Sequence, residues 1–484
     1  RLDYVRGIGF SIRPMPAVGL PEILMYDASQ GVRLHPVPRA NKLGSTTAFP
    51  ALSMLASGWN PSVSARYGRA VAEECRAGGI HILLGPGLNI YRNSQNGRSF
   101  EYLGEDPFLT STIVTPYITG MQQAGVMATA KHFIANNTDY IRRLSNSVVS
   151  RRALEEIYLP GFRAAVQAGV AAVMTSYNQL NGEYTGESRS AIHELLRKEL
   201  GFDGLVMTDW ESVTSGTALA ASGQDLEMPV GEVLARDAEQ LLGSEQVDRM
   251  CRSVLTSLCR MGFTDRAQEL RELLPAVRDH GAVAYQAASE GMVLLKNQDS
   301  LLPLRDTTTQ RIMVCGNWST RTPIAGEGSG KVDGWKRQSI AAGIQERFSG
   351  ADVRMNPRPN AEELAASDLI IIVSGQDSEG EARDHDFAFP AHQNELVEAA
   401  TTTGAPTVLV AVTGGGFAMP WEDKLNAIIW TSFPGQEGPR ALADILCGAT
   451  NPSGKIPFTV ESEYSDSPAY GDIPPGGSVE QEQP

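Results

Sequence analysis

The segment Gly204-Leu-Val-Met-Thr-Asp-Trp210 indicates the fold, because a short apolar run ends there in an acidic and an aromatic residue. Such a run is typical of a strand buried on both faces of a parallel sheet. Helical patterns separate it from similar runs, for example 150–160, with Ser150 as the expected N-cap, and 191–200. The similar runs are Ile80–Leu84, Val126–Ala130 and Ala171–Thr175. This alternation predicts an α/β barrel or a doubly wound sheet.

A second alternating series begins near residue 283, so a chain of 484 residues is expected to form more than one domain. Its apolar runs are 311–316, 368–374, 407–412 and 427–430. They predict an open parallel sheet flanked by helices, which is a separate α/β sandwich. We expect a first domain at 1–264, a charged linker at 265–282, the sandwich at 283–460 and an extended tail at 461–484, where the sequence is polar and rich in Pro and Gly.

The composition excludes several classes of partner. With 41 Lys+Arg against 56 Asp+Glu, the formal net charge of −15 disfavours nucleic acid and anionic membrane surfaces. No apolar run reaches the roughly 18 residues that a membrane-spanning helix needs. A signal peptide is either removed or was never present, so the location is barely constrained, with the periplasm or the exterior slightly favoured over the cytoplasm. The assembly is not fixed by the sequence, and a homodimer is one of the states left open.

Polar residues follow several of the expected strands, at the carboxyl ends where α/β barrels carry their catalytic residues. The runs of the first series end in Lys131-His132, Ser176-Tyr177-Asn178 and Asp209-Trp210. Cleavage of a glycoside requires two carboxyl groups beside the scissile bond. Asp209 is a candidate for one of them, and Trp210 could offer its ring to a sugar face, although an acid at a strand end is often only a cap. The acidic loop 378–384 could supply the second carboxyl group, although such a charge run is usually a solvated loop.

Other chemistries match less well. The stretch Ala325–Lys331 resembles a phosphate-binding loop, but Ala325 replaces its first Gly and Val332 replaces its Ser or Thr. The seven histidines form no HExxH pattern, and there is no paired CxxC site. We therefore expect no cofactor and no catalytic metal.

Nine separated motifs carry a resemblance that covers nearly the whole chain. They are Met25–Arg33, Gly97–Pro107, Lys131–Asn137, Thr175–Asn178, Gly201–Trp210, Gln224–Pro229, Glu290–Asn297, Pro434–Gly438 and Asn451–Pro457. In sequence and order they resemble glycoside hydrolase family 3, the β-glucosidase-like enzymes. The resemblance implies an α/β fold with a (β/α)8-like TIM barrel, followed by an α/β sandwich with a mostly parallel sheet. It also places the active site at the interface of the two.

The resemblance implies a role for particular residues. Asp209 corresponds to the nucleophile of a retaining enzyme. Glu381 corresponds to the acid/base residue in its Glu-x-x-Asp context, completed by Asp384, and Glu379 is the fallback. We expect Glu381 to stay protonated near neutral pH through partial burial and a nearby carboxylate. The subsite for the non-reducing sugar is expected to contain Asp27, Arg98, Lys131, His132 and Tyr177.

Some alternatives stay open. A carboxylate at Asp27 would bind the C4 and C6 hydroxyls of glucose, so a β-glucosidase is expected first and a β-xylosidase or mixed β-glycosidase second. The loop after Lys131-His132-Phe133 lacks the His of the N-acetylglucosaminidase branch. A catalytically inactive sugar-binding protein is the rival class, and Asp209 with Glu381 argues against it. Trp210, Trp318, Trp335 and Phe417 could be sugar platforms or ordinary core residues.

Overall fold

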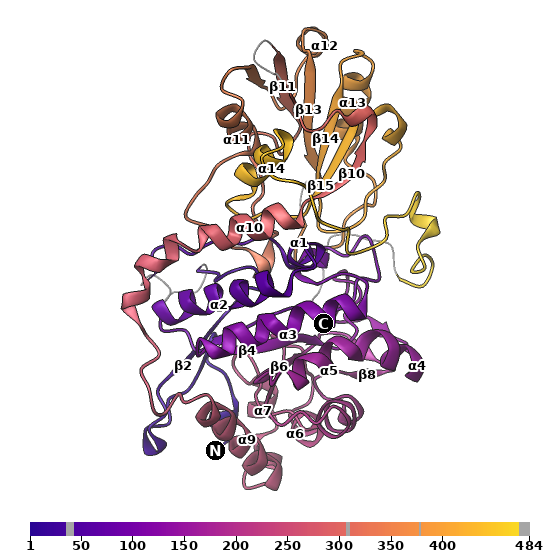
Figure 1. Cartoon of the computed structure of the whole chain (residues 1–484). Helices are drawn as coiled ribbons and strands as arrows, with labels where there is room; N and C mark the ends of the chain where they lie inside the picture. The colour runs from indigo at the N-terminus through magenta and orange to yellow at the C-terminus, as the bar shows by residue number, and fades with distance from the viewer. Residues whose placement is uncertain (35–42, 306–309, 377–378, 474–484) are drawn as a thin grey trace.

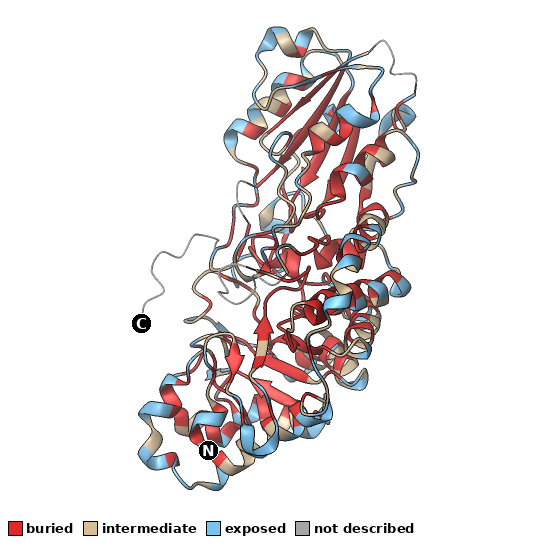
Figure 2. Cartoon of the chain, turned by 90° about the vertical axis from the view of Figure 1, so that its left-hand side faces the viewer, coloured by how far each residue is buried: buried red, intermediate tan, exposed pale blue. Residues whose placement is uncertain are grey.

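A barrel-like domain and an α/β sandwich follow one another along the chain and lie one above the other in Figure 1. The computed structural model describes residues 1–34, 43–305, 310–376 and 379–473. Each domain has its own large apolar core, and Figure 2 shows the buried residues concentrated on the strands of both. The α/β fold with two domains that we expected is therefore confirmed.

The first series of strands forms a six-stranded sheet in the order β1-β2-β3-β4-β6-β9. Its strands are β1 (Ser11–Ile12), β2 (Ile23–Tyr26), β3 (Ile82–Leu83), β4 (Met127–Phe133), β6 (Ala172–Thr175) and β9 (Leu205–Met207). All neighbours are parallel except β1 and β2. Single bridges from Met207 to Leu226, from Arg6 to Glu227 and from Gly7 to Ile12 close the ring. The sheet is thus a barrel, and its closure rests on isolated pairs rather than on further strands.

Helical segments cover the outside of the barrel, and several begin at side-chain caps. Asn60 and Asp106 accept backbone N–H groups at the starts of α2 and α3, and Ser150 caps α4 as expected. The α- and π-helical segments of this half are α1 (Leu52–Ser57), α2 (Pro61–Ala77), α3 (Pro107–Gln123), α4 (Arg151–Ala153), η5 (Leu154–Tyr158), α5 (Leu159–Gln167), η6 (Ser190–Glu199), α6 (Gly216–Ser222), α7 (Glu232–Arg236), α8 (Ala238–Leu241) and α9 (Glu245–Arg260). A small sheet of β5 (Asn146–Ser147), β7 (Gln179–Leu180) and β8 (Glu183–Tyr184) lies beside them.

The second sheet has the order β10-β15-β14-β13-β11-β12, and β10 alone among its strands is antiparallel. Its strands are β10 (Val293–Asn297), β11 (Arg311–Cys315), β12 (Asp352–Met355), β13 (Leu369–Gly375), β14 (Thr407–Val412) and β15 (Ala427–Thr431). The helices around it are α11 (Ile340–Arg347), α12 (Ala361–Ala365), α13 (Ala391–Thr401) and α14 (Gly438–Leu446). The chain runs from β11 outward to β12 and then back to β13 on the other side of β11. The strand order therefore reverses between β11 and β13.

The stretch proposed as a linker contains two short helical turns, η7 (Arg271–Leu273) and η8 (Pro275–Arg278), and leads into α10 (Gly281–Gly291). In the stretch expected as a tail, η12 (Tyr464–Asp466) is a short 3-10 helix, and the Tyr464 hydroxyl donates to Asn93 Oδ1 at 3.1 Å. Residues 474–484 lie outside the described residues. Within the described part of the chain, no helix is both long and apolar enough to cross a bilayer.

His280 joins the start of α10 to α2 through two carboxylates. Its Nδ1 lies 3.0 Å from Glu74 Oε1 and its Nε2 lies 3.0 Å from Glu73 Oε2. Burial opposes a charge on His280, but the hydrogen bonds and charges of the two carboxylates outweigh it and raise the pKa of the imidazole above its usual value. The cationic form is therefore the one that holds the two helices together.

Replacement of His280 by alanine is expected to lower the free energy of unfolding by about 3 kcal/mol at pH 6, because it leaves Glu74 buried without its partner. A raised histidine pKa stabilises the fold fully below the unfolded value, and this contribution is lost as the pH rises through the folded value. The difference between wild type and variant should therefore shrink by pH 9 in urea unfolding experiments. The exposed His392 on α13 provides a control, and His392→Ala should change stability by no more than about 0.5 kcal/mol. An equal loss at both pH values would show that charge is not the cause.

Candidate active site

Side chains at the carboxyl ends of the barrel strands converge on a cavity of about 160 Å³. The residues that follow or end β2, β4, β6 and β9 lie there together, as parallel strands require. The lining residues are Phe10, Asp27, Arg33, Arg98, Lys131, His132, Met174, Tyr177, Asp209, Trp210, Ser329 and Glu381. All eight residues that we expected from the sequence are brought together here, and the cavity is polar, charged and largely buried.

Asp209 lies just beyond β9, and its two oxygens have different surroundings. Its Oδ1 accepts the backbone N–H of Trp210 at 2.7 Å, while Oδ2 is buried without a hydrogen bond among the described residues. The nearest cation-forming group to Oδ2 is His132, whose Nε2 lies at 3.5 Å. Burial, together with Arg98, Lys131 and Arg142, lowers the pKa of His132 well below its usual value, so the ring is neutral. Asp209 therefore presents one unpaired oxygen to the cavity beside a neutral imidazole.

Asp27 at the end of β2 lies between two cations. Its carboxylate is 3.9 Å from Lys131 Nζ and 3.5 Å from Arg33 Nη1. Burial raises the pKa of Asp27 to about 6, against the lowering effect of Lys131. The carboxylate and ammonium together form a pair of acceptor and donor groups of the kind that adjacent sugar hydroxyls require.

Arg98 is buried and only partly satisfied. It forms a fork with Glu101, with its Nη2 at 2.8 Å from Oε2, and Nη2 also donates to Ser329 Oγ at 3.2 Å. Its Nη1 has no hydrogen-bond partner among the described residues and lies 3.9 Å from Glu381 Oε1. Because an unpaired buried donor is unfavourable, Nη1 is well placed to meet a bound hydroxyl group.

Glu381 reaches the cavity on a loop of the second domain that is fastened to the barrel. Asp384 Oδ1 accepts the backbone N–H groups of Asp139 at 2.9 Å and of Gly97 at 3.2 Å, and Thr138 donates to its Oδ2. A side chain at Gly97 would collide with the carbonyl oxygen of Arg383, so the two loops touch through backbone. The Glu-x-x-Asp pattern therefore has a structural reason, because Asp384 positions the segment that carries Glu381.

The expected charge state of Glu381 is wrong for the free protein. Glu381 Oε1 accepts Arg142 Nη2 at 2.9 Å, and its Oε2 accepts the backbone N–H of Ser329 at 2.9 Å. Burial raises the pKa of this carboxyl, but Arg98 and Arg142 outweigh burial and hold the pKa well below its usual range. The two guanidinium groups decide the outcome, and Glu381 is ionised in this structure.

Glu379, the fallback acid, does not line this cavity. Its Oε2 accepts the backbone N–H of Gly414 at 2.6 Å, and burial raises its pKa to about 8. Trp210 lines the same cavity as Asp209 and contacts the ring of Phe10, with centroids 4.9 Å apart. Of the other aromatic candidates, Phe417 is a core residue stacked on Phe389. Trp335 packs on Arg278, with the guanidinium carbon 4.7 Å from its ring centroid.

Several neighbours in the site were not predicted. Phe10, Arg33, Met174 and Ser329 line the cavity, and Arg142 lies over the Tyr177 ring at 4.0 Å from its centroid. Arg33 ends the motif Met25–Arg33 that carries the family resemblance, so its place in the site could have been predicted from the sequence. Ser329 belongs to the short 3-10 helix η10 (Gly328–Gly330) of the second domain, and Arg142 belongs to a barrel loop and donates to Glu381 of that second domain. Among the described residues, no group of His, Cys, Asp and Glu side chains is arranged to hold a metal ion.

A small polar cavity with carboxyl groups at barrel strand ends is typical of enzymes that cleave glycosides. Residues 13–227 match the glycosyl hydrolase family 3 N-terminal domain, and residues 292–483 match the family 3 C-terminal domain. The chain belongs to glycosyl hydrolase family 3, and it is a glycoside hydrolase.

Relatives and solved structures agree with this membership. The chain is 36% identical to a beta-glucosidase of Bacteroides ovatus, with 100% of this chain and 72% of that protein covered. It is 33% identical to thermostable beta-glucosidase B of Acetivibrio thermocellus, with 96% and 64% covered, and 32% identical to an exo-alpha-(1->6)-L-arabinopyranosidase of Bifidobacterium longum, with 96% and 65% covered. The structure of beta-glucosidase 3B from Thermotoga neapolitana in complex with glucose superposes with a TM-score of 0.88 at 30% identity, covering 97% of this chain and 75% of that chain.

Proposed function

We propose that the protein is a retaining, exo-acting β-glucosidase that removes terminal non-reducing β-D-glucosyl residues. The observation that carries this proposal is the combination of Asp27, Lys131 and the unpaired Asp209 Oδ2 in a single cavity of about 160 Å³. This volume is below the roughly 300–1,000 Å³ of pockets for drug-sized ligands, so it suits one terminal sugar ring rather than an internal segment of a polymer. The beta-glucosidase relatives and the glucose complex support the choice of sugar.

In the proposed mechanism, Asp209 attacks the anomeric carbon through Oδ2 while Glu381 protonates the leaving oxygen. The glycosyl-enzyme ester then reacts with water, from which Glu381 takes a proton, so that Asp209 is again a carboxylate and Glu381 again an acid. Glu381 releases its proton to solvent as the sugar leaves. Neutral His132 and the charged groups of Arg98 and Lys131 orient the hydroxyl groups. Because Glu381 is ionised in the free protein, it has to gain its proton as the substrate binds. Bound hydroxyls that replace Glu381 as the partner of Arg142, occupy Arg98 Nη1 and exclude water would raise the pKa of Glu381 in this way.

A panel of aryl glycosides tests the function directly. Wild-type protein is expected to hydrolyse the β-glucoside fastest, and NMR of the first-formed sugar should show β-glucose, which identifies retention. The panel includes the β-xyloside, for the mixed-specificity alternative, and the α-L-arabinopyranoside, because one relative carries that name. A preference for either of these over the β-glucoside would contradict the proposal, and binding of sugar without any turnover would favour a sugar-binding protein.

Replacement of Asp27 by alanine is expected to lower kcat/KM for the aryl β-glucoside by about 100-fold or more, since two hydroxyl contacts to a charged group are lost. The loss should be smaller for the aryl β-xyloside, because xylose has no C6 hydroxyl for the carboxylate to bind. Steady-state kinetics on both substrates measure the ratio. The exposed Asp3 provides a control, and Asp3→Ala should leave both values unchanged. An equal loss of kcat/KM on the two substrates would show that Asp27 does not bind the C6 hydroxyl.

A further inference from the structure

A second cavity, of about 400 Å³, lies in the α/β sandwich where the strand order reverses between β11 and β13. Trp318 follows β11 and lines this cavity, and Gln376 and Glu379 follow β13 and line it as well. In open α/β sheets, ligands bind outside the carboxyl ends of the strands at such a reversal. The cavity is larger than the catalytic one, and its volume lies in the range of ligand pockets.

The two cavities are separated by a wall of two paired segments. The Glu327 backbone N–H donates to the Glu379 carbonyl at 2.9 Å, which joins the loop at 326–331 to the segment 379–381. Residues along these segments face different cavities: Glu327 and Glu379 line the larger one, whereas Ser329 and Glu381 line the catalytic one. The second cavity is therefore a separate site behind the segment that carries Glu381.

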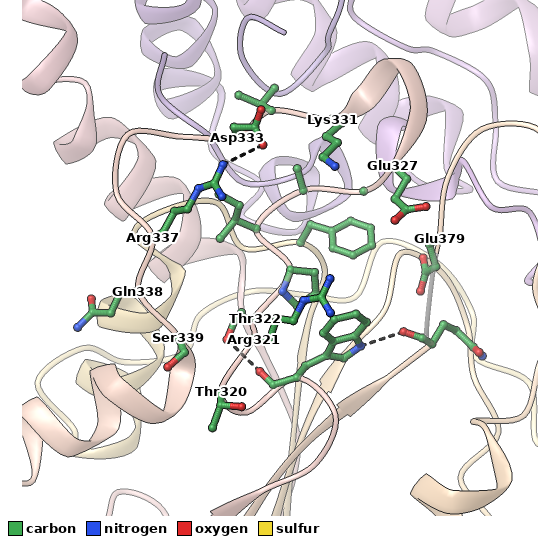
Figure 3. Close-up of a pocket in the computed structure, with 18 residues that line it drawn as sticks. Thr320, Arg321, Thr322, Glu327, Lys331, Asp333, Arg337, Gln338, Ser339 and Glu379 are labelled. Atoms are coloured by element: carbon green, nitrogen blue, oxygen red, sulfur yellow. Dashed lines mark hydrogen bonds and ion pairs between the residues drawn. The ribbon is translucent and has the colours of Figure 1, made fainter. Parts of the chain in front are cut away.

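Glu379 carries the strongest sign that this cavity takes a ligand. Its side chain is only 3% exposed, and Oε1 has no hydrogen-bond partner among the described residues, although Oε2 accepts from Gly414. Figure 3 shows Glu379 at one edge of the cavity, with Arg337 and Asp333 across it. Burial raises the pKa of Glu379 to about 8, so near neutral pH it is a neutral acid that can donate as well as accept. A buried polar group without a partner requires an explanation, and a bound hydroxyl group supplies one.

The other lining groups fit a carbohydrate better than a phosphate. Trp318 is half-buried, and its indole N–H is held by the Gln376 carbonyl at 2.8 Å, which fixes the ring at the cavity wall. The N-terminus of α11 lies beside the cavity, but its first N–H groups are already bonded. Ile340 N–H donates to Thr322 Oγ1 at 2.7 Å, Ala341 N–H to the Ser319 carbonyl at 2.9 Å and Ala342 N–H to Ser339 Oγ at 3.1 Å. Charged side chains of both signs also line the cavity: Arg321, Lys331 and Arg337 with Glu327 and Asp333. An aromatic face beside such hydrogen-bonding groups of mixed charge is suited to a sugar ring, whose hydroxyls both donate and accept.

We propose that this cavity is a second, non-catalytic sugar site that binds a short β-linked gluco-oligosaccharide, with Trp318 as the stacking surface and Glu379 as the buried hydrogen-bonding group. The choice of glucose units rests on the proposed function. The existence of the site rests on the cavity, the unpaired oxygen and the strand reversal.

The test is a calorimetric titration of Asp209→Asn protein, which does not consume its ligand, with cellotriose. Two binding sites are expected, and the second should weaken about tenfold or more in Trp318→Ala and in Glu379→Ala, since each loses a principal contact. Glu379→Gln should retain binding within about threefold, because an amide also donates and accepts. Glu395→Ala, an exposed residue on α13, is the matched control and should bind as the parent does.

Oxidative footprinting covers the case in which a variant fails to fold. Cellotriose should protect Trp318 from oxidation in the Asp209→Asn protein. A single binding site, or a second site unaffected by Trp318→Ala and Glu379→Ala, overturns the proposal, as does an unprotected Trp318. Xylotriose is titrated in parallel, and if it alone fills the second site, the glucose assignment is overturned. Failure of the β-glucosidase proposal is seen separately, in the turnover of aryl glycosides by the wild type.

Discussion

Replacement of Asp209 by asparagine lowers kcat/KM for an aryl β-glucoside by at least about 10³-fold, if this carboxylate forms the glycosyl-enzyme bond. The side chain keeps its shape, and its Oδ1 contact with the Trp210 N–H can remain. What is lost is the negative charge on Oδ2, which is the attacking atom. Steady-state kinetics, together with circular dichroism to verify folding, measure the effect.

Asp203 provides the matched control, because it precedes the same strand but is exposed, in a surface ion pair with Arg260. Asp203→Asn should keep wild-type turnover. In Asp209→Gly, added azide is expected to restore cleavage of a dinitrophenyl β-glucoside and to give the α-glucosyl azide, because the small anion attacks from the vacated side. An Asp209→Asn protein that retained a tenth of the activity would contradict the nucleophile assignment.

Replacement of Glu381 by glutamine has an effect that depends on the leaving group. For a poor leaving group such as the glucose of cellobiose, kcat/KM should fall by about 10²–10⁴-fold, because the leaving oxygen is no longer protonated. For a dinitrophenyl β-glucoside, which needs no acid, kcat/KM should change little while kcat falls, since water is no longer activated. Azide should then raise kcat and give the β-glucosyl azide.

Glu379→Gln is the comparison that identifies the acid. Glu379 lies two residues from Glu381 and has the raised pKa usually associated with a general acid, but it lines the other cavity. We expect Glu379→Gln to show no dependence on the leaving group. If the loss of activity in Glu379→Gln depends on the leaving group and that in Glu381→Gln does not, Glu379 is the general acid and the assignment of Glu381 is wrong.

Much of the site was predictable from the sequence, because many of its functional side chains lie at the ends of strands that the apolar runs predict. β14 has the bounds expected from its apolar run, whereas β4 continues through the expected Lys131-His132 pair and ends at Phe133. Parallel strands bring their carboxyl ends to one edge, so His132, Tyr177 and Asp209 could be grouped without coordinates. Asp27 was added to this group only by the family resemblance. Glu381 was assigned to the same site through the ordered family motifs. No local sequence pattern predicts that a loop of the second domain lies beside the barrel.

The charge state of the acid could not be predicted in the same way. Arg142 and Glu381 are 239 positions apart, and their contact at 2.9 Å exists only because the Asp384 loop docks on the barrel. Burial alone predicts a protonated Glu381, which is what the sequence suggested. Glu381 is instead ionised in the free protein, because tertiary packing brings the guanidinium groups of Arg98 and Arg142 close to it.

By itself, the sequence determined the α/β alternation in both halves of the chain, the family, and a set of polar residues at barrel strand ends, because these depend on local periodicity and on motifs. The tertiary structure alone decided how the barrel closes through single bridges, which carboxyl groups are charged, and that Glu379 and Glu381 face different cavities. The physical reason is that ionisation and burial depend on distances between atoms far apart in the chain.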